Sequence, residues 1–211
     1  MKYISRINGS VVKAKGNDDF SVQDMVYVGT IRLVGEVISV DGDEATVQVY
    51  ESTSGLKPGE PVETTGEPLS VYLAPGIIGN MFDGIQRPLE KLYETSGDFI
   101  TRGQQMENLD TQKKWHFIPV LQEGAQVGAL SVFGEIPETG SVRHKAMIPL
   151  PLSGAASAAD GVLEYIAPEG EYTITDCIAK VRAENGELRE IRMLSRWPVR
   201  IPRPYKKRIS A

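Results

Sequence analysis

The chain has 211 residues, of which 41% are hydrophobic and 24% charged, the composition of an ordinary globular protein. Its formal net charge is −5, yet six of its 23 basic side chains lie between Arg196 and Arg208, where there is no acid. The rest of the chain therefore carries a net charge of −11. This acidic body argues against a nucleic-acid-binding surface, because neutralising phosphates requires clustered Lys and Arg.

The sequence indicates a reducing compartment. A single cysteine, Cys177, cannot form an internal disulfide. The first residues lack the apolar stretch of a signal peptide, and no apolar run approaches the ~18 residues expected of a spanning helix. We expect a cytoplasmic protein that reaches a membrane only through partners.

Short strands separated by tight turns are expected in residues 1–66. Gly9-Ser10 and Asp41-Gly42-Asp43 are hairpin signals. Within the strand that follows Asp43, apolar and polar side chains alternate, which indicates one buried and one wet face. The expected strands are 3–8, 11–15, 31–40 and 44–50. A small closed antiparallel β-barrel would remove the exposed edges of such a sheet.

Residues 67–109 have a different pattern and form an expected helical connecting segment. Ile77, Ile78, Met81 and Phe82 follow helical spacing. Pro88 then predicts a helix start, Leu89, Leu92 and Tyr93 are expected on its apolar face, and Gly97 is its stop signal.

A second β-rich domain is expected over residues 110–195. Asn185-Gly186 is a strong hairpin signal between its last two strands. The small polar stretch 153–161 is expected to be a mobile loop, and 196–211 a solvated, proline-rich basic connector or tail. Phe117, Phe133 and Tyr165 are core candidates by alternation. The expected strands are 115–120, 129–136, 143–148, 162–167, 174–182 and 187–194.

No pattern of catalytic residues is present. There is no Gly-Lys dipeptide, which a phosphate-binding P-loop requires, and no Gly-x-Gly-x-x-Gly fingerprint. His116 and His144 are far apart in sequence, and with one cysteine they give no metal-ligand spacing. We expect no cofactor and no catalytic residue in this chain.

Several strings resemble the catalytic A subunit of V-type and archaeal-type rotary ATPases. The strongest is Phe-Asp-Gly-Ile-Gln-Arg-Pro-Leu at 82–89. Others are Val-Gln-Val-Tyr-Glu-Ser-Thr-Ser-Gly-Leu at 47–56, Pro-Gly-Ile-Ile at 75–78 and Trp-Pro-Val-Arg at 197–200. The resemblance covers nearly the whole chain.

The resemblance implies an architecture and partners. Residues 1–66 would be the barrel in the crown of the catalytic A3B3 hexamer, 67–109 would contain the first piece of the nucleotide-binding domain, and 110–195 would be the bulge domain. The B subunit and the peripheral-stalk subunits would be the partners, in ATP hydrolysis or synthesis coupled to proton or sodium transport. The family's P-loop positions do not occur before Ala211. The resemblance therefore implies that ATP and Mg²⁺ bind elsewhere in the intact catalytic chain.

Five residues are candidates for subunit contacts under this interpretation: Tyr50, Glu51, Thr53, Gly55 and Arg87. The first four are expected in a turn between barrel strands that also lines the crown contact. Arg87 has a second interpretation, as a helix-start arginine satisfied by solvent.

A second resemblance is to the biotinyl/lipoyl-like hammerhead, at 123–136, His144-Lys145 and Gly161-Val162. Lys145 does not lie in the Met-Lys or Asp-Lys motif of a modified carrier, so a barrel-sandwich fold without the modification is expected. The alternatives left open are a free-standing β interaction module of this type and an enzyme that acts through this chain alone.

Overall fold

The structure, a computed structural model, describes residues 1–16, 20–149 and 160–202, which form sixteen strands and one short helix. This part of the chain folds into two compact units, each assembled from separate stretches. Unit 1 comprises residues 1–71, 83–106 and the chain from Pro198. Unit 2 comprises 72–82 and 107–197. The expected mainly β fold, with two β-rich domains and one short helical segment, is confirmed.

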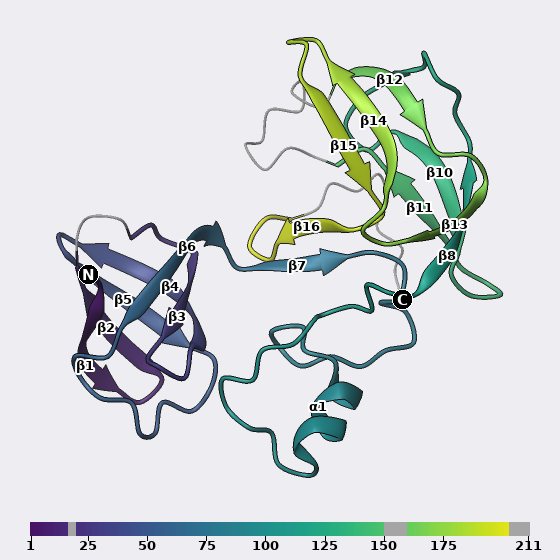
Figure 1. Cartoon of the computed structure of the whole chain (residues 1–211). Coiled ribbons are helices and arrows are strands. Elements are labelled where there is room, and N and C mark those ends of the chain that lie inside the picture. Colours follow the sequence, from purple (N-terminus) through teal and green to yellow (C-terminus); the bar gives the residue numbers. More distant parts are fainter. Residues whose placement is uncertain (17–19, 150–159, 203–211) are drawn as a thin grey trace, which may run out of the picture. The chain divides into compact units, whose positions relative to one another are not determined.

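Unit 1 contains a small antiparallel barrel with the strand order β1-β2-β5-β4-β3-β6 (Figure 1). The two outer strands are joined by backbone hydrogen bonds, since Ile4 N donates to Glu60 O at 2.8 Å and Val62 N donates to Lys2 O at 3.0 Å. These bonds close the sheet into a barrel where β1 and β6 begin. Its strands are β1 (Tyr3–Asn8), β2 (Val11–Lys15), β3 (Asp24–Val28), β4 (Leu33–Asp41), β5 (Glu44–Val49) and β6 (Val62–Pro68).

The barrel core follows the predicted alternation. Ala45, Val47 and Val49 of β5 are buried, whereas the residues between them are partly exposed. Apolar side chains from all six strands and from the loop residues Phe20 and Leu56 complete the core. The expected hairpins are also present, because Asn8 pairs with Val11 and Asp41 pairs with Glu44. The predicted strands thus have nearly the correct bounds, while β3 and β6 were not separately predicted.

The helix α1 (Leu89–Ser96) belongs to unit 1. Pro88 occupies the N-cap position, and Gly97 ends the helix with a φ of 66°. Leu92 is buried, as predicted, but Tyr93 is 64% exposed, which corrects its assignment to the packed face.

Unit 2 consists of two four-stranded antiparallel sheets, ordered β11-β10-β8-β13 and β15-β14-β12-β9. One hydrophobic core lies between them, and it includes Phe117 and Phe133, both predicted and both fully buried. The strands are β8 (Lys114–Pro119), β9 (Gln126–Val127), β10 (Val132–Pro137), β11 (Arg143–Met147), β12 (Gly161–Ile166), β13 (Gly170–Thr173), β14 (Cys177–Ala183) and β15 (Leu188–Arg192). Two further strands, β7 (Ser70–Leu73) and β16 (Ser195–Pro198), pair in a separate two-stranded sheet.

Three predictions in unit 2 are wrong for local reasons. Tyr165 is 37% exposed, because a register shift between Leu163 and Tyr165 interrupts the alternation along β12. The strand expected from 129 begins only at Val132, after a turn closed by Ser131 N donating to Gly128 O. The strand expected from 174 begins at Cys177, because Asp176 N donates to Thr173 O in another turn. Most of the expected mobile loop 153–161 lies outside the described residues.

Residues 77–82 do not form a helix, contrary to the spacing of their apolar side chains. Gly76 and Gly79 have φ values of 104° and 88°, which a right-handed helix does not allow. The carboxylate of Glu138 instead accepts hydrogen bonds from the backbone N–H groups of Gly76 (2.7 Å) and Ile78 (3.2 Å). Ile77 and Phe82 pack against the core of unit 2, whereas Ile78 and Met81 are exposed, so only half of the apolar pattern reflects packing.

Candidate functional site

The end of strand β5 is the point where two other segments of unit 1 are fastened to the barrel. The two residues that follow the strand, Tyr50 and Glu51, each bind a different segment. The Tyr50 hydroxyl binds Glu36, which is paired with Arg200 of the segment from Pro198. Glu51 is paired with Arg87 of the segment 83–106.

The first contact is centred on Glu36, a carboxylate in β4 that is 2% exposed. Arg200 makes a bidentate ion pair with it, in which Nε donates to Oε1 at 2.9 Å and Nη2 donates to Oε2 at 2.6 Å. The Tyr50 hydroxyl donates to Oε2 at 2.6 Å. Both oxygens of the buried carboxylate are therefore satisfied, and a planar guanidinium provides the geometry that such a pair requires.

This environment shifts the ionisation of the carboxylate and the phenol. The hydrogen bond from Arg200 lowers the pKa of Glu36 from its usual 4.5, and the Tyr50 hydroxyl adds to the effect while burial opposes it. Burial and the hydrogen bond to Glu36 raise the pKa of Tyr50 to about 12. The carboxylate thus stays ionised and the phenol stays protonated at neutral pH.

The second contact is an ion-pair network around Arg87. Its Nε donates to Asp83 Oδ2 at 2.7 Å, and Nη1 lies 3.3 Å from both Glu51 Oε2 and the Gln104 backbone oxygen. Glu51 Oε2 also accepts the backbone N–H of Gly103 at 3.1 Å. The side chains of Arg87 and Glu51 are each only 9% exposed. The interpretation of Arg87 as a residue satisfied by solvent is therefore wrong.

The loop after Glu51 carries the remaining candidates. The Thr53 hydroxyl donates to Gly9 O at 2.6 Å, and Leu56 N donates to Thr53 O at 3.0 Å. Gly55 has a φ of 88° and no neighbouring atom within 4 Å of the place where a Cβ would lie. Arg102 donates from Nη1 to the backbone oxygens of Ser52 and Ser54.

We call residues 52–59, with their mostly exposed side chains, the rim loop.

The structure therefore places all five candidates in unit 1, at one end of β5. Four of them, Tyr50, Glu51, Thr53 and Arg87, make side-chain hydrogen bonds within the chain. Contact of any of the five with a neighbouring polypeptide stays a prediction. Sequence reasoning missed Glu36, Asp83 and Arg200; the available signal was an acid in the apolar strand 33–37. In the described part of the connector, which ends at Pro202, residues 199–202 are exposed, as expected of a solvated segment. The pair of Arg200 with Glu36 of the barrel was not expected.

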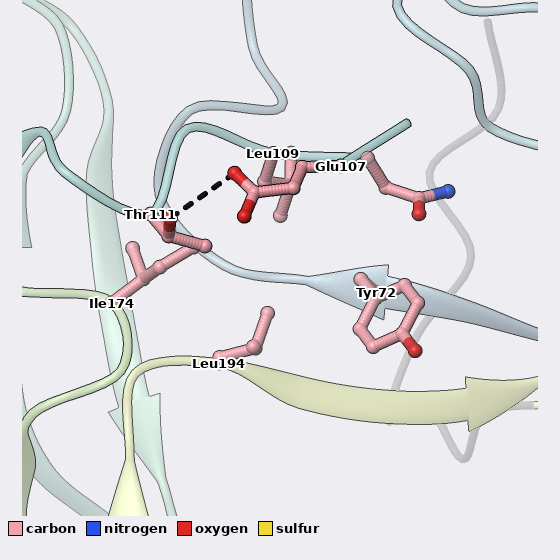
Figure 2. A pocket seen from close by; sticks show the side chains of 7 residues that line it. Tyr72, Glu107, Leu109, Thr111, Ile174 and Leu194 are labelled. Atoms are coloured by element: carbon pink, nitrogen blue, oxygen red, sulfur yellow. Dashed lines mark hydrogen bonds between the residues drawn. The ribbon is translucent and has the colours of Figure 1, made fainter. Parts of the chain in front are cut away.

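Unit 2 contains a small pocket of about 180 Å³, shown in Figure 2. Tyr72 of β7 lines it together with Leu109, Ile174 and Leu194, and the Thr111 hydroxyl donates to Glu107 Oε2 at 3.1 Å on its polar side. A space of this size can take a group about as large as a benzene ring, and its lining is mostly apolar. Its described lining residues include no Lys, Arg or His that could bind a phosphate group.

The lysine that a hammerhead carrier would modify has a different position here. Lys145 lies inside β11, paired with Glu135, whereas the turn between β10 and β11 spans residues 138–142. Across residues 1–16, 20–149 and 160–202, no group of three or more His, Cys, Asp and Glu side chains is arranged to hold a metal ion. Over the same residues, no helix has the length and apolar character needed to cross a bilayer.

Comparison with known proteins assigns both domains to one family. Residues 4–66 match the family model described as the β-barrel domain of the ATP synthase alpha/beta family. Residues 106–200 match the model of the barrel-sandwich domain of the ATP synthase alpha/beta subunit.

Related full sequences agree with these matches. The chain is 46% identical to the A subunit of the A-type ATP synthase of Pyrococcus abyssi, 45% identical to that of Desulfurococcus sp. and 47% identical to that of Methanopyrus kandleri. The alignments cover 98%, 99% and 98% of this chain, but the chain spans only 20%, 34% and 34% of those proteins. With its closed barrel and its two-sheet second unit, this chain belongs to the ATP synthase alpha/beta family, of which it carries the β-barrel and barrel-sandwich domains.

Proposed function

We propose that the chain serves as the N-terminal assembly part of the catalytic A subunit in a V/A-type rotary ATP synthase or ATPase. The barrel joins alternating A and B subunits in an A3B3 ring, and the barrel-sandwich domain contacts the peripheral-stalk subunits. In the intact complex, ATP hydrolysis or synthesis is coupled to proton or sodium transport. The observation that carries this proposal is the 45–47% identity to the A subunit of A-type ATP synthases along nearly the whole chain.

The construction of unit 1 supports a role as a rigid assembly element. The barrel is closed, and the rim loop is fixed by Arg102 and Thr53. A loop held in this way loses little conformational entropy on binding a neighbour, which favours association.

Exposed apolar side chains on the segment 83–106 support a further contact within the intact catalytic chain. Tyr93, Phe99 and Ile100 are 64%, 85% and 53% exposed. A surface of this kind commonly marks a protein interface. We assign it to packing against the nucleotide-binding domain, whose first piece the segment resembles.

The chain on its own is proposed to lack ATPase activity. Its sequence has no P-loop, and ATP with Mg²⁺ is proposed to bind to other parts of the intact catalytic chain. Its location is then cytoplasmic, peripheral to the membrane through the complex.

Binding to isolated partners tests the proposal. The chain is mixed with the B subunit and with the stalk subunits of an A-type ATP synthase, and complexes are measured by size exclusion and calorimetry. Binding to the B subunit or to one of the stalk subunits is the expected result. If the chain binds none of these partners, the free-standing β module is favoured. ATP hydrolysis by the isolated chain would contradict the assembly role.

Two variants at opposite ends of β5 locate the contact with the B subunit. Ser54→Glu combined with Lys57→Glu places two acidic groups on the rim loop, where both residues are exposed. Asp43→Lys changes an exposed residue in the hairpin at the other end of the strand and is the matched control. The rim-loop variant is expected to weaken binding by about tenfold or more, whereas the control is not, because charge without a partner at an interface is costly. Equal effects would place the contact elsewhere.

A further inference from the structure

We propose that Glu36, Tyr50 and Arg200 form a latch that holds the connector, residues 198–202, on the outer wall of the barrel, so that barrel and connector move as one body. The latch is a property of this chain and does not depend on the proposed assembly.

The position of Glu36 in its strand is the first argument. Leu33 and Val37 of β4 belong to the barrel core, so by alternation Glu36 points to the outside. An outward-facing glutamate should be solvated, yet Glu36 is only 2% exposed. Tyr50 and Arg200, its hydrogen-bond partners, supply polar atoms at this otherwise water-facing position. The carboxylate is thus covered by groups other than the barrel's own core.

The chemistry of the pair is the second argument. Arg200 is separated from Glu36 by 164 positions, yet its Nε and Nη2 atoms bind both carboxylate oxygens. Tyr50, which is 42% exposed, adds its hydroxyl to Oε2 and thereby fixes the carboxylate in one orientation. A lysine at position 200 could supply a charge but not two parallel N–H groups, so the geometry requires arginine.

The path of the connector agrees with this role. Val199 N donates to Leu69 O at 3.0 Å, and Pro198 beside it is buried. Arg200 follows directly and keeps its side chain 54% exposed, so water can reach the pair. When the pair opens, Glu36 becomes a solvated surface carboxylate and the apolar core of the barrel is not disturbed. The latch can therefore open while the barrel stays folded.

Cleavage by trypsin after Arg200 measures whether the latch is open. Trypsin must take up the Arg200 side chain, which is not available while it is bound to Glu36. The full chain is treated with trypsin under native conditions, and the rate of cleavage at the Arg200–Ile201 bond is followed by mass spectrometry. Glu36→Gln is expected to accelerate this cleavage about tenfold, and Tyr50→Phe by a smaller factor, because each removes a bond to or from the carboxylate.

Glu63→Gln is the matched control. It removes another barrel carboxylate, which pairs with Arg32 in an exposed ion pair, and cleavage at Arg200 should keep the wild-type rate. An unchanged rate in Glu36→Gln, or an equal acceleration in Glu63→Gln, would overturn the proposal.

Hydrogen exchange distinguishes latch opening from unfolding. Glu36→Gln and Arg200→Lys are expected to accelerate exchange of the Val199 amide by a larger factor than exchange of the β2 and β5 amides. If Glu36→Gln accelerates exchange of the β2 and β5 amides by the same factor as that of the Val199 amide, the pair opens only when the barrel unfolds, and the latch as described is refuted.

Discussion

Glu51 and Arg87 are 36 positions apart in sequence, and their side chains meet with 3.3 Å between Oε2 and Nη1 in a place where each is only 9% exposed. Through this pair, the segment that contains α1 is fixed to the barrel. The second oxygen of Glu51, Oε1, is buried without a hydrogen-bond partner among the described residues. The pair therefore sits in an environment where losing one member is costly.

Glu51→Ala should destabilise unit 1 strongly. The substitution leaves the guanidinium of Arg87 with Asp83 as its one charged partner in the network and releases the amide of Gly103. A loss of about 3 kcal/mol in the free energy of unfolding is expected, measured by urea denaturation. Glu63→Ala removes the exposed pair with Arg32 and should cost less than about 1 kcal/mol. Equal losses would show that the Glu51 pair behaves as a surface pair.

Gly103→Ala should be much more damaging than Gly97→Ala, although both glycines have a φ of 66°. A Cβ at position 103 would lie 2.0 Å from the backbone oxygen of Ile31, whereas a Cβ at position 97 meets nothing within 4 Å. Backbone strain at a positive φ costs of order 1 to 3 kcal/mol at either site. At position 103 the clash with Ile31 must be relieved by a displacement of residues 102–104, which lowers the free energy of unfolding by about 2 kcal/mol more. Thermal denaturation of the two variants gives the comparison, and similar melting temperatures would contradict it.

The Glu36 pair should stabilise the protein only while its carboxylate is ionised. Because the folded-state pKa of Glu36 is lowered from 4.5, its contribution is present above that value and is lost as the pH falls through the folded-state pKa. The difference in unfolding free energy between wild type and Glu36→Gln should therefore be constant near neutral pH and shrink as the pH falls below 4.5. Denaturant titrations across this range test it.

Glu44 is a useful comparison in that experiment, because its pKa is also lowered, first by the hydrogen bond from Lys13. Its side chain is accessible to solvent, so screening weakens the pair. Added salt should reduce the effect of Glu44→Gln more than that of Glu36→Gln. The opposite order of salt sensitivity would contradict the burial of Glu36.

Much of the fold could be predicted because its signals are local. Gly9-Ser10 and Asn185-Gly186 mark real hairpins, and the alternation of Ala45, Val47 and Val49 gives the buried face of β5. The errors arose where one residue changes the local geometry. The bulge before Tyr165 exposes a residue whose spacing predicts burial, and the glycines at 76 and 79 prevent the helix that the apolar spacing of residues 77–82 indicates.

The polar contacts at the end of β5 could not be predicted in the same way. The latch joins residues 36, 50 and 200, and no local pattern relates them. Arg200 lies in a basic, proline-rich stretch, which by composition indicates a solvated connector. An acid inside the apolar strand Leu33–Val37 could have suggested that a partner exists, because an unpaired buried carboxylate is costly. It could not have identified that partner.

His116 should titrate above its ordinary pKa because two carboxylates flank its ring. Nε2 lies 3.0 Å from Glu169 Oε1, and Nδ1 lies 3.1 Å from Glu171 Oε1, so the imidazolium can donate to both. The hydrogen bond to Glu169 is the largest cause of the raised pKa, followed by that to Glu171. The contacts of His116 with the two carboxylates therefore contribute fully to the free energy of unfolding below the unfolded-state pKa of about 6.5. It is lost as the pH rises through the folded-state value.

An NMR titration of the His116 ring measures this shift directly. Glu169→Gln should lower the pKa of His116 towards 6.5, its ordinary value. Glu164→Gln removes an exposed carboxylate of the same unit, one that pairs with Arg182 and not with His116, and should leave the titration unchanged. If His116 titrates at its ordinary value in the wild type, the two carboxylates do not hold the ring in solution. An equal shift in both variants would instead mean that the net charge of the unit, and not these two contacts, sets the pKa.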